Sequence, residues 1–197
     1  MKAQPSRWSV SVLSLLLLAI ASCQKAPEPP RLGTLSDFSL TSQSGASFGS
    51  AELRGKPFVA AFFFTRCPTV CPVIARRMRA LQLEARKKKL ELAFVSISVD
   101  PENDTPEVLR RYAQNVEADT SSWTFLTGDY ELIRRTAEQG FKLAVEGRAD
   151  AAAADFGILH GSHLVLVDGA LQIRGYYRSS DEAEMARLLA DAERLGS

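Results

Sequence analysis

Two apolar runs frame the middle of the chain. The residues "PFVAAFFF" at 57–64 and "LAFVSISVD" at 92–100 are apolar at nearly every position, which is typical of strands buried on both faces of a sheet. Between them, apolar side chains recur at helical spacing and predict a helix over about residues 72–89. Strand, helix and strand in this order indicate a β-α-β unit.

The rest of the chain continues this alternation. The turn residues "TSQSG" separate "SDFSL" from "ASFGS" and predict an entry hairpin over 36–50. Caps and periodicity predict three further helices and four further strands, namely helices at 105–116, 129–140 and 181–195 and strands at 123–127, 142–146, 163–168 and 171–177. The pattern therefore predicts an α/β fold, a thioredoxin-like three-layer α/β/α sandwich with an N-terminal hairpin.

The start of the chain has a different character. Lys2 and Arg7 precede "VSVLSLLLLAIAS" and then Cys23, which is the order of a secretory signal. Because a helix needs about 20 apolar residues to cross a bilayer, a cleaved peptide is favoured over a permanent span. "IASC" at 20–23 resembles a bacterial lipobox, in which the cysteine is lipidated. The alternative is an ordinary signal peptide in which Cys23 has no role. We expect a signal peptide over 1–22, a lipidated anchor and Pro-rich linker over 23–33, and one domain over 34–197.

Composition narrows the classes of function. The chain has 197 residues, is 46% hydrophobic and carries a formal net charge of +1, so no broad basic surface for nucleic acid is indicated. Of its three cysteines, lipidation of Cys23 would leave one pair in the exported domain. Export to the periplasmic face of a bacterial membrane would expose that pair to an oxidising compartment.

The remaining pair lies in "FFFTRCPTVCP" at 62–72, directly after an apolar run. Pro68 disfavours helical backbone at Cys67, and Pro72 lacks an N–H, so we expect the helix to begin at Pro72 with Cys71 at its cap. Helix N–H groups then face the sulfurs and lower the thiol pKa values. Thiolates suit disulfide exchange or a soft metal such as Cu(I). A purely structural disulfide would gain little from so short a loop.

A third ligand would make a copper site more selective. The chain has two histidines, His160 and His163, both in "FGILHGSHLVLVD" immediately before an apolar strand. In a thioredoxin-like sheet this loop lies beside the loop that carries the cysteines, so either imidazole could reach the sulfurs. The residues alone do not choose between them.

Three segments together, "FFFTRCPTVCPV", "SISVDPENDTPEVLRRYA" and "HGSHLVLVDGALQIRGYY", resemble the SCO/SenC family of exported, thioredoxin-fold copper proteins linked to cytochrome c oxidase assembly. The resemblance covers roughly residues 34–195. It implies that copper is bound by the two cysteines of CxxxCP and by a histidine eight residues before the aspartate of the "LVD" strand. These positions are Cys67, Cys71 and His160, which leaves His163 as a residue of the strand edge.

Two aspartates occur in the second of these segments, which resembles a family loop near the metal. Asp100 ends a predicted strand at the face where such sheets bind ligands. It is either a turn residue before Pro101 or a residue beside the ligands, and we do not expect it to bind the metal. We assign Asp104 to the cap region before the helix that starts at Pro106.

Two functions remain open. The first is a copper metallochaperone that binds Cu(I) or Cu(II) and delivers it to the copper-site subunit of cytochrome c oxidase, after a thiol reductant has reduced Cys67 and Cys71 from their disulfide. The second is an exported thiol-disulfide oxidoreductase that uses the same pair. Thioredoxins use CxxC, and they carry a proline before the strand that faces the active site. This chain has a longer spacing and no proline after Pro106, which favours the first function. A third function, peroxide reduction on the same fold, requires a lone activated cysteine in a threonine-containing pocket at a different spacing, and this chain does not match that pattern.

Overall fold

The fold is organised around one strand that is buried along its whole length. In the computed structural model, which describes residues 27–143 and 163–196, every residue of β4 (Phe58–Phe63) is buried. This strand comes from the apolar run at 57–64, and β5 (Ala93–Ser98), from the run at 92–100, pairs with it in parallel. Both predicted central strands are therefore confirmed.

The described elements follow the predicted alternation. The other strands are β1 (Gly33–Thr34), β2 (Ser39–Ser42), β3 (Ser47–Gly49), β6 (Trp123–Thr127), β7 (His163–Val167) and β8 (Gln172–Arg178). The helices are α1 (Ser50–Leu53), α2 (Val70–Lys87), α3 (Pro106–Asn115), α4 (Tyr130–Arg135), which continues as the π-helical turn Thr136–Gly140, and α5 (Glu182–Leu195).

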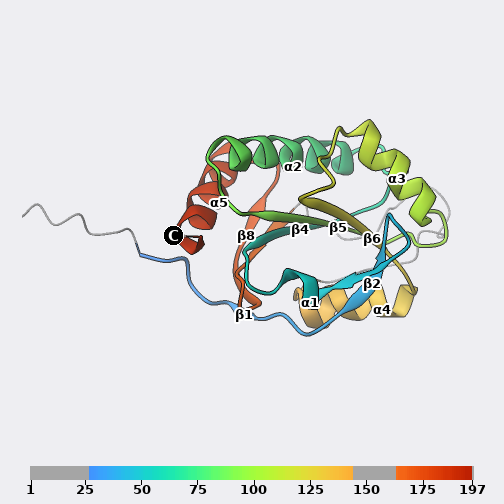
Figure 1. Ribbon diagram of the computed structural model, residues 1–197, viewed down its shortest axis with the longest axis horizontal. Helices are drawn as coiled ribbons and strands as arrows, with labels where there is room; N and C mark the ends of the chain where they lie inside the picture. Colours follow the sequence, from blue (N-terminus) through green and yellow to red (C-terminus); the bar gives the residue numbers. More distant parts are fainter. Residues whose placement is uncertain (1–26, 144–162, 197) are drawn as a thin grey trace, which may run out of the picture.

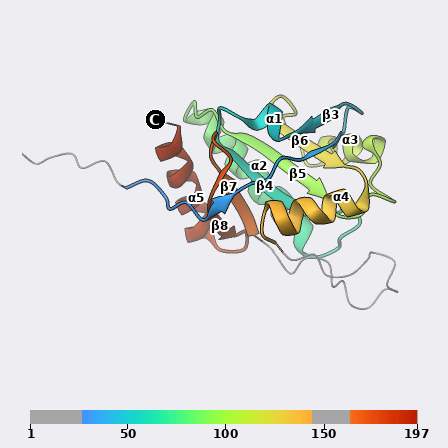
Figure 2. The ribbon, with the colours of Figure 1, turned by 90° about the horizontal axis from the view of Figure 1, so that it is seen from below.

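The strands form one sheet in the order β1-β8-β7-β4-β5-β6-β2-β3. Figure 1 shows α2, α3 and α5 along one face of this sheet, and α4 on the other face. The view from below in Figure 2 shows α4 in front of the strands. The three layers confirm the predicted thioredoxin-like sandwich, and β2 and β3 confirm its N-terminal hairpin.

The parallel strands place the candidate functional residues at one edge of the sheet. The cysteine loop follows the carboxyl end of β4, and the loop with Asp100 and Asp104 follows the carboxyl end of β5, where Phe63 and Ser98 are paired. Strand β7 runs antiparallel to β4, so it begins at this same edge, with His163 as its first residue. Ligands bind beyond the carboxyl ends of strands in such sheets.

The structure differs from the sequence prediction in several local details. Helix α2 begins at Val70 rather than Pro72, so Cys71 lies in its first turn and not at its cap. Pro72 is tolerated there because N–H groups of the first turn have no acceptor within the helix. The short strand β1, which pairs with β8, was not predicted. The strand predicted at 142–146 lies mainly outside the described residues, and Lys142 and Leu143 are not in a strand.

No helix in the described ranges is long and apolar enough to span a bilayer. The predicted signal peptide over 1–22 and the lipidation site Cys23 lie outside those ranges.

Candidate metal centre

The two cysteines of the CxxxCP motif are close neighbours and almost fully buried. Cys67 precedes α2 and is 8% exposed, whereas Cys71 lies in the first turn of α2 and is 4% exposed. Both are free thiols. The backbone N–H of Cys71 donates to the sulfur of Cys67 at 3.4 Å, and the N–H of Cys67 donates to the carbonyl of Phe64 at 3.3 Å. The helix start thus orients the sulfur of Cys67 toward its partner.

The surroundings of the two sulfurs give the two thiols different pKa values. Burial raises the pKa of Cys67, but hydrogen bonds to its sulfur from Cys71 and Thr69 outweigh burial, and its pKa is lowered overall. Burial raises the pKa of Cys71 to about 12, and its interactions with Cys67 add to the rise. The sequence prediction of lowered pKa values therefore holds for Cys67 alone, because the deeper burial of Cys71 dominates there.

These acidities predict different pH profiles for alkylation of the reduced protein. Because the thiolate is the reactive form, Cys67 should react with iodoacetamide with a midpoint below the ordinary value for a cysteine thiol, while Cys71 stays protonated and slow across about pH 6 to 10. Peptide mapping by mass spectrometry at each pH measures both rates. In urea the two cysteines should react alike. Equal rates in the folded protein at about pH 7 would contradict the assignment.

Asp100 is joined to the cysteine loop by an ion pair. Its carboxylate is 2% exposed, and Oδ2 accepts from Nη2 of Arg66 at 2.8 Å and from Nε at 3.2 Å. Its other oxygen accepts from Nδ2 of Asn103 at 2.9 Å. Since Arg66 directly precedes Cys67, Asp100 links the end of β5 to the cysteine loop, and both of its oxygens are engaged without a metal.

Asp104 lies directly before the cap of α3, in the cap region expected from the sequence, but its side chain takes no part in capping. The side chain of Thr105 accepts from the N–H of Val108 and is the cap of α3. Asp104 is instead completely buried, and its carboxylate accepts hydrogen bonds from Thr65 and Ser98. Thr105 already supplies the cap, so the helix does not need a second capping side chain directly before it. This is the one signal in the sequence that could have indicated another role for Asp104.

The two histidines differ in what the structure describes. His163 is half-buried at the start of β7, where it pairs with Arg178 of β8. His160 lies outside the described residues. Within residues 27–143 and 163–196, no three His, Cys, Asp or Glu side chains gather as a potential metal site. The described part of the candidate centre therefore consists of the two thiols.

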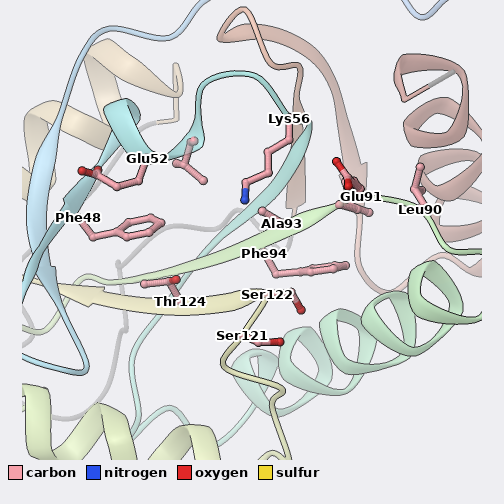
Figure 3. Close-up of a pocket in the computed structure, with 12 residues that line it drawn as sticks. Phe48, Glu52, Lys56, Leu90, Glu91, Ala93, Phe94, Ser121, Ser122 and Thr124 are labelled. Atoms are coloured by element: carbon pink, nitrogen blue, oxygen red, sulfur yellow. The ribbon is translucent and has the colours of Figure 1, made fainter.

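A separate cavity of about 340 Å³ lies at the opposite edge of the sheet. It is lined by residues around the amino ends of β5 and β6, among them Ala93, Phe94 and Thr124, together with Lys56 and Glu91 (Figure 3). Because β4, β5 and β6 are parallel, this edge is the one away from the cysteines. The cavity is thus not part of the candidate metal centre.

The profile of the family described as SCO1/SenC matches residues 26–195. The chain belongs to the SCO1/SenC family. A SCO1/SenC family lipoprotein from Bacillus anthracis is 34% identical, and the match covers 87% of this chain and all of the other, with a TM-score of 0.79. The resemblance in the three sequence segments is thereby confirmed.

Two further solved structures of the family carry functional descriptions. BsSco, described as having a disulfide switch and as a member of the Sco family of cytochrome c oxidase assembly proteins, is 26% identical over 85% of this chain and 96% of its own, with a TM-score of 0.75. ScoI of Bradyrhizobium japonicum, solved with copper bound, is 26% identical over 82% of this chain and 99% of its own, with a TM-score of 0.61.

Proposed function

We propose that this protein is a copper metallochaperone that binds Cu(I) or Cu(II) and delivers copper to the binuclear copper site of cytochrome c oxidase during its assembly. The observation that carries the proposal is the pair of free, buried thiols at the carboxyl edge of the sheet. Membership of a family that contains a copper-bound structure supports it.

The donor set suits copper. Two thiolates and one imidazole are ligands that favour Cu(I), and imidazole also serves Cu(II). Cys67 and Cys71 would supply the sulfurs, and their hydrogen-bonded arrangement brings them together before any metal arrives. His160 would supply the imidazole. The family resemblance implies this position. His163, three residues further along the chain, begins β7 at the sheet edge shared with the cysteine loop, and three residues span at most about 10 Å, so the chain length lets His160 reach that edge.

Each thiol must lose its proton to bind metal, so binding releases protons. Cys67, whose pKa is lowered, is the thiol that would meet copper first. Cys71 would give up its proton only as the second bond forms, because burial disfavours its free thiolate. The protonation of Cys71 would also assist release, as a partner's ligands replace the sulfurs one at a time.

The expected setting follows from the N-terminal sequence. We propose an exported domain over 34–197, held at the periplasmic face of a bacterial membrane by lipid on Cys23 and by the linker 23–33, after removal of residues 1–22. A multiply acylated cysteine holds a protein firmly at a membrane. In an oxidising compartment the Cys67–Cys71 pair would tend to close into a disulfide, so a thiol reductant is a required partner.

The delivery step is tested by direct transfer. Full-length protein loaded with one Cu(I) is mixed, without oxygen, with the metal-free copper domain of a cytochrome c oxidase subunit, and the two are separated by size for copper analysis. We expect copper to move to the oxidase domain. If that domain takes Cu(I) from a small chelator but none from the loaded protein, delivery is excluded.

The alternative function, reduction of disulfides in the oxidase subunit or another exported protein, is favoured by one observation. The pKa of Cys67 is lowered and that of Cys71 is raised. This difference is typical of a pair in which one cysteine attacks the target disulfide and the other resolves the mixed disulfide. The disulfide switch described for BsSco also supports it. In the transfer experiment, this function would appear as loss of the target's disulfide with matching oxidation of Cys67 and Cys71, without copper movement.

A further inference from the structure

A buried carboxylate outside the proposed ligand set connects the cysteine loop to the neighbouring strand. We propose that Asp104 is a positioning residue, which holds the loop before α2 in the conformation that binds copper. This inference rests on the copper site proposed above. It concerns the loop backbone at Thr65 rather than a bond from Asp104 to the metal.

The contacts of Asp104 converge on Thr65. Its Oδ2 accepts from the backbone N–H of Thr65 at 3.0 Å, and its Oδ1 accepts from the hydroxyl of Thr65 at 2.5 Å. Ser98, the last residue of β5, donates its hydroxyl to Oδ2 at 2.5 Å. The carboxylate thereby joins the end of β4, the end of β5 and the loop before α3.

These hydrogen bonds act close to the sulfurs. Thr65 is two residues before Cys67, and the N–H of Cys67 is held by the carbonyl of Phe64. Asp104 thus holds this short segment at Thr65, and the hydrogen bond between Phe64 and Cys67 closes residues 64–67 into a turn. A rigid loop keeps the two thiols at a set separation, and groups that orient metal ligands in this way contribute to affinity.

The charge of Asp104 is costly to bury. The residue is 0% exposed, and no Lys or Arg in the described part of the chain forms an ion pair with it. Burying an unpaired carboxylate is unfavourable unless hydrogen bonds replace its water. A carboxylate accepts all three hydrogen bonds through its two oxygens. An asparagine would offer only one acceptor oxygen, so its NH2 group would have to donate to the hydroxyl of Thr65, which can also accept. The observed contacts therefore suit a carboxylate, and an asparagine would reverse one of them.

Its role is distinct from that of its neighbours. Asp100 receives the guanidinium of Arg66 and the amide of Asn103, and Thr105 caps α3. Neither residue contacts Thr65 through its side chain in the described hydrogen bonds. Asp104 alone among these three connects to the cysteine loop backbone.

The substitution Asp104→Asn tests the proposal in the full-length protein. It keeps the shape, but it replaces the carboxylate by a neutral amide and reverses the contact with the Thr65 hydroxyl, so the hydrogen bonds that hold the loop become weaker. We expect Cu(I) affinity, measured by competition with bicinchoninate, to fall about 10- to 100-fold, the range found when groups orienting metal ligands are removed. Thr65→Val should reduce affinity in the same direction, and Thr65→Ser, which keeps the hydroxyl, should restore most of it.

The matched control is Asp191→Asn. Asp191 is also a buried carboxylate, 7% exposed, and accepts from the hydroxyl of Tyr177 at 2.6 Å, but it lies on α5 and makes no described hydrogen bond to the cysteine loop. We expect it to reduce the free energy of unfolding without changing Cu(I) affinity. An equal loss of affinity in Asp191→Asn would mean that any buried substitution has this effect, and would overturn the positioning role.

A second readout does not depend on copper. In a glutathione redox buffer, the disulfide takes up two electrons and two protons to give the thiols of Cys67 and Cys71. A loosened loop presents the thiols to each other less often, so Asp104→Asn should favour the dithiol at least about tenfold, equivalent to a rise in reduction potential of about 30 mV. If wild type binds no Cu(I), the proposed function fails and this potential alone decides the role of Asp104. Unchanged affinity and unchanged potential in Asp104→Asn would overturn the inference.

Discussion

Replacing Cys71 with serine should abolish tight binding of Cu(I). The variant loses one of two thiolates, and a serine hydroxyl is a hard ligand that does not ionise near neutral pH. We expect affinity to fall by at least about 1000-fold, or about 4 kcal/mol, because each tenfold change corresponds to about 1.4 kcal/mol. Anaerobic titration of the reduced full-length protein against bicinchoninate measures the change, and Cys67→Ser should give a loss of the same order.

The control separates copper binding from folding. Serine is close in size to cysteine, and Cys71 is packed in the apolar core, so thermal unfolding of each variant is measured beside its affinity. A folded Cys71→Ser that still binds one Cu(I) as tightly as wild type would exclude the cysteine pair as the site. Cys23→Ser, which removes the third cysteine, should leave the affinity unchanged.

The second large effect is expected at His160. Without its imidazole, Cu(I) would be held by the two sulfurs alone, which is a linear and less selective arrangement. His160→Ala should therefore weaken Cu(I) binding about 10- to 100-fold, or about 1.4 to 2.8 kcal/mol. It should weaken Cu(II) binding more, since imidazole suits Cu(II) better than thiolates alone do. Competition titration and the Cu(II) absorption spectrum measure the two effects.

His163→Ala is the matched control. His163 begins β7 and pairs across to Arg178, so its loss should affect only the edge of the sheet and leave copper affinity within about twofold of wild type. The reverse result, with His163→Ala weakened and His160→Ala unchanged, would assign the third ligand to His163. That outcome would contradict the position implied by the family resemblance.

The sequence predicts those parts of the structure that local patterns decide. Continuous apolar runs predicted β4 and β5, because a strand buried on both faces needs apolar side chains at every position. The motif at 62–72 identified the thiol pair, since its spacing and prolines are local features. The start of α2 was predicted two residues late, because a proline inside the first turn of a helix is as acceptable as one at its start.

Only the tertiary structure decided the pKa values of the two thiols. The helix start predicted lowered pKa values for both thiols, and this holds for Cys67. Cys71 is packed among the residues of the core, and the resulting desolvation raises its pKa to about 12. Burial depends on what packs over a side chain from elsewhere in the chain, so the sequence motif could not reveal it.

The sequence by itself therefore determined the order of the central strands and main helices, the family and the cysteine pair. The contact between Asp104 and Thr65 was decided by the tertiary structure, because it joins residues 39 positions apart. Parallel pairing of β4 with β5 sets Phe63 beside Ser98, and the loops that follow these two residues then meet at one sheet edge. No local pattern of charge or hydrophobicity encodes that register, which comes from packing both strands into a common core.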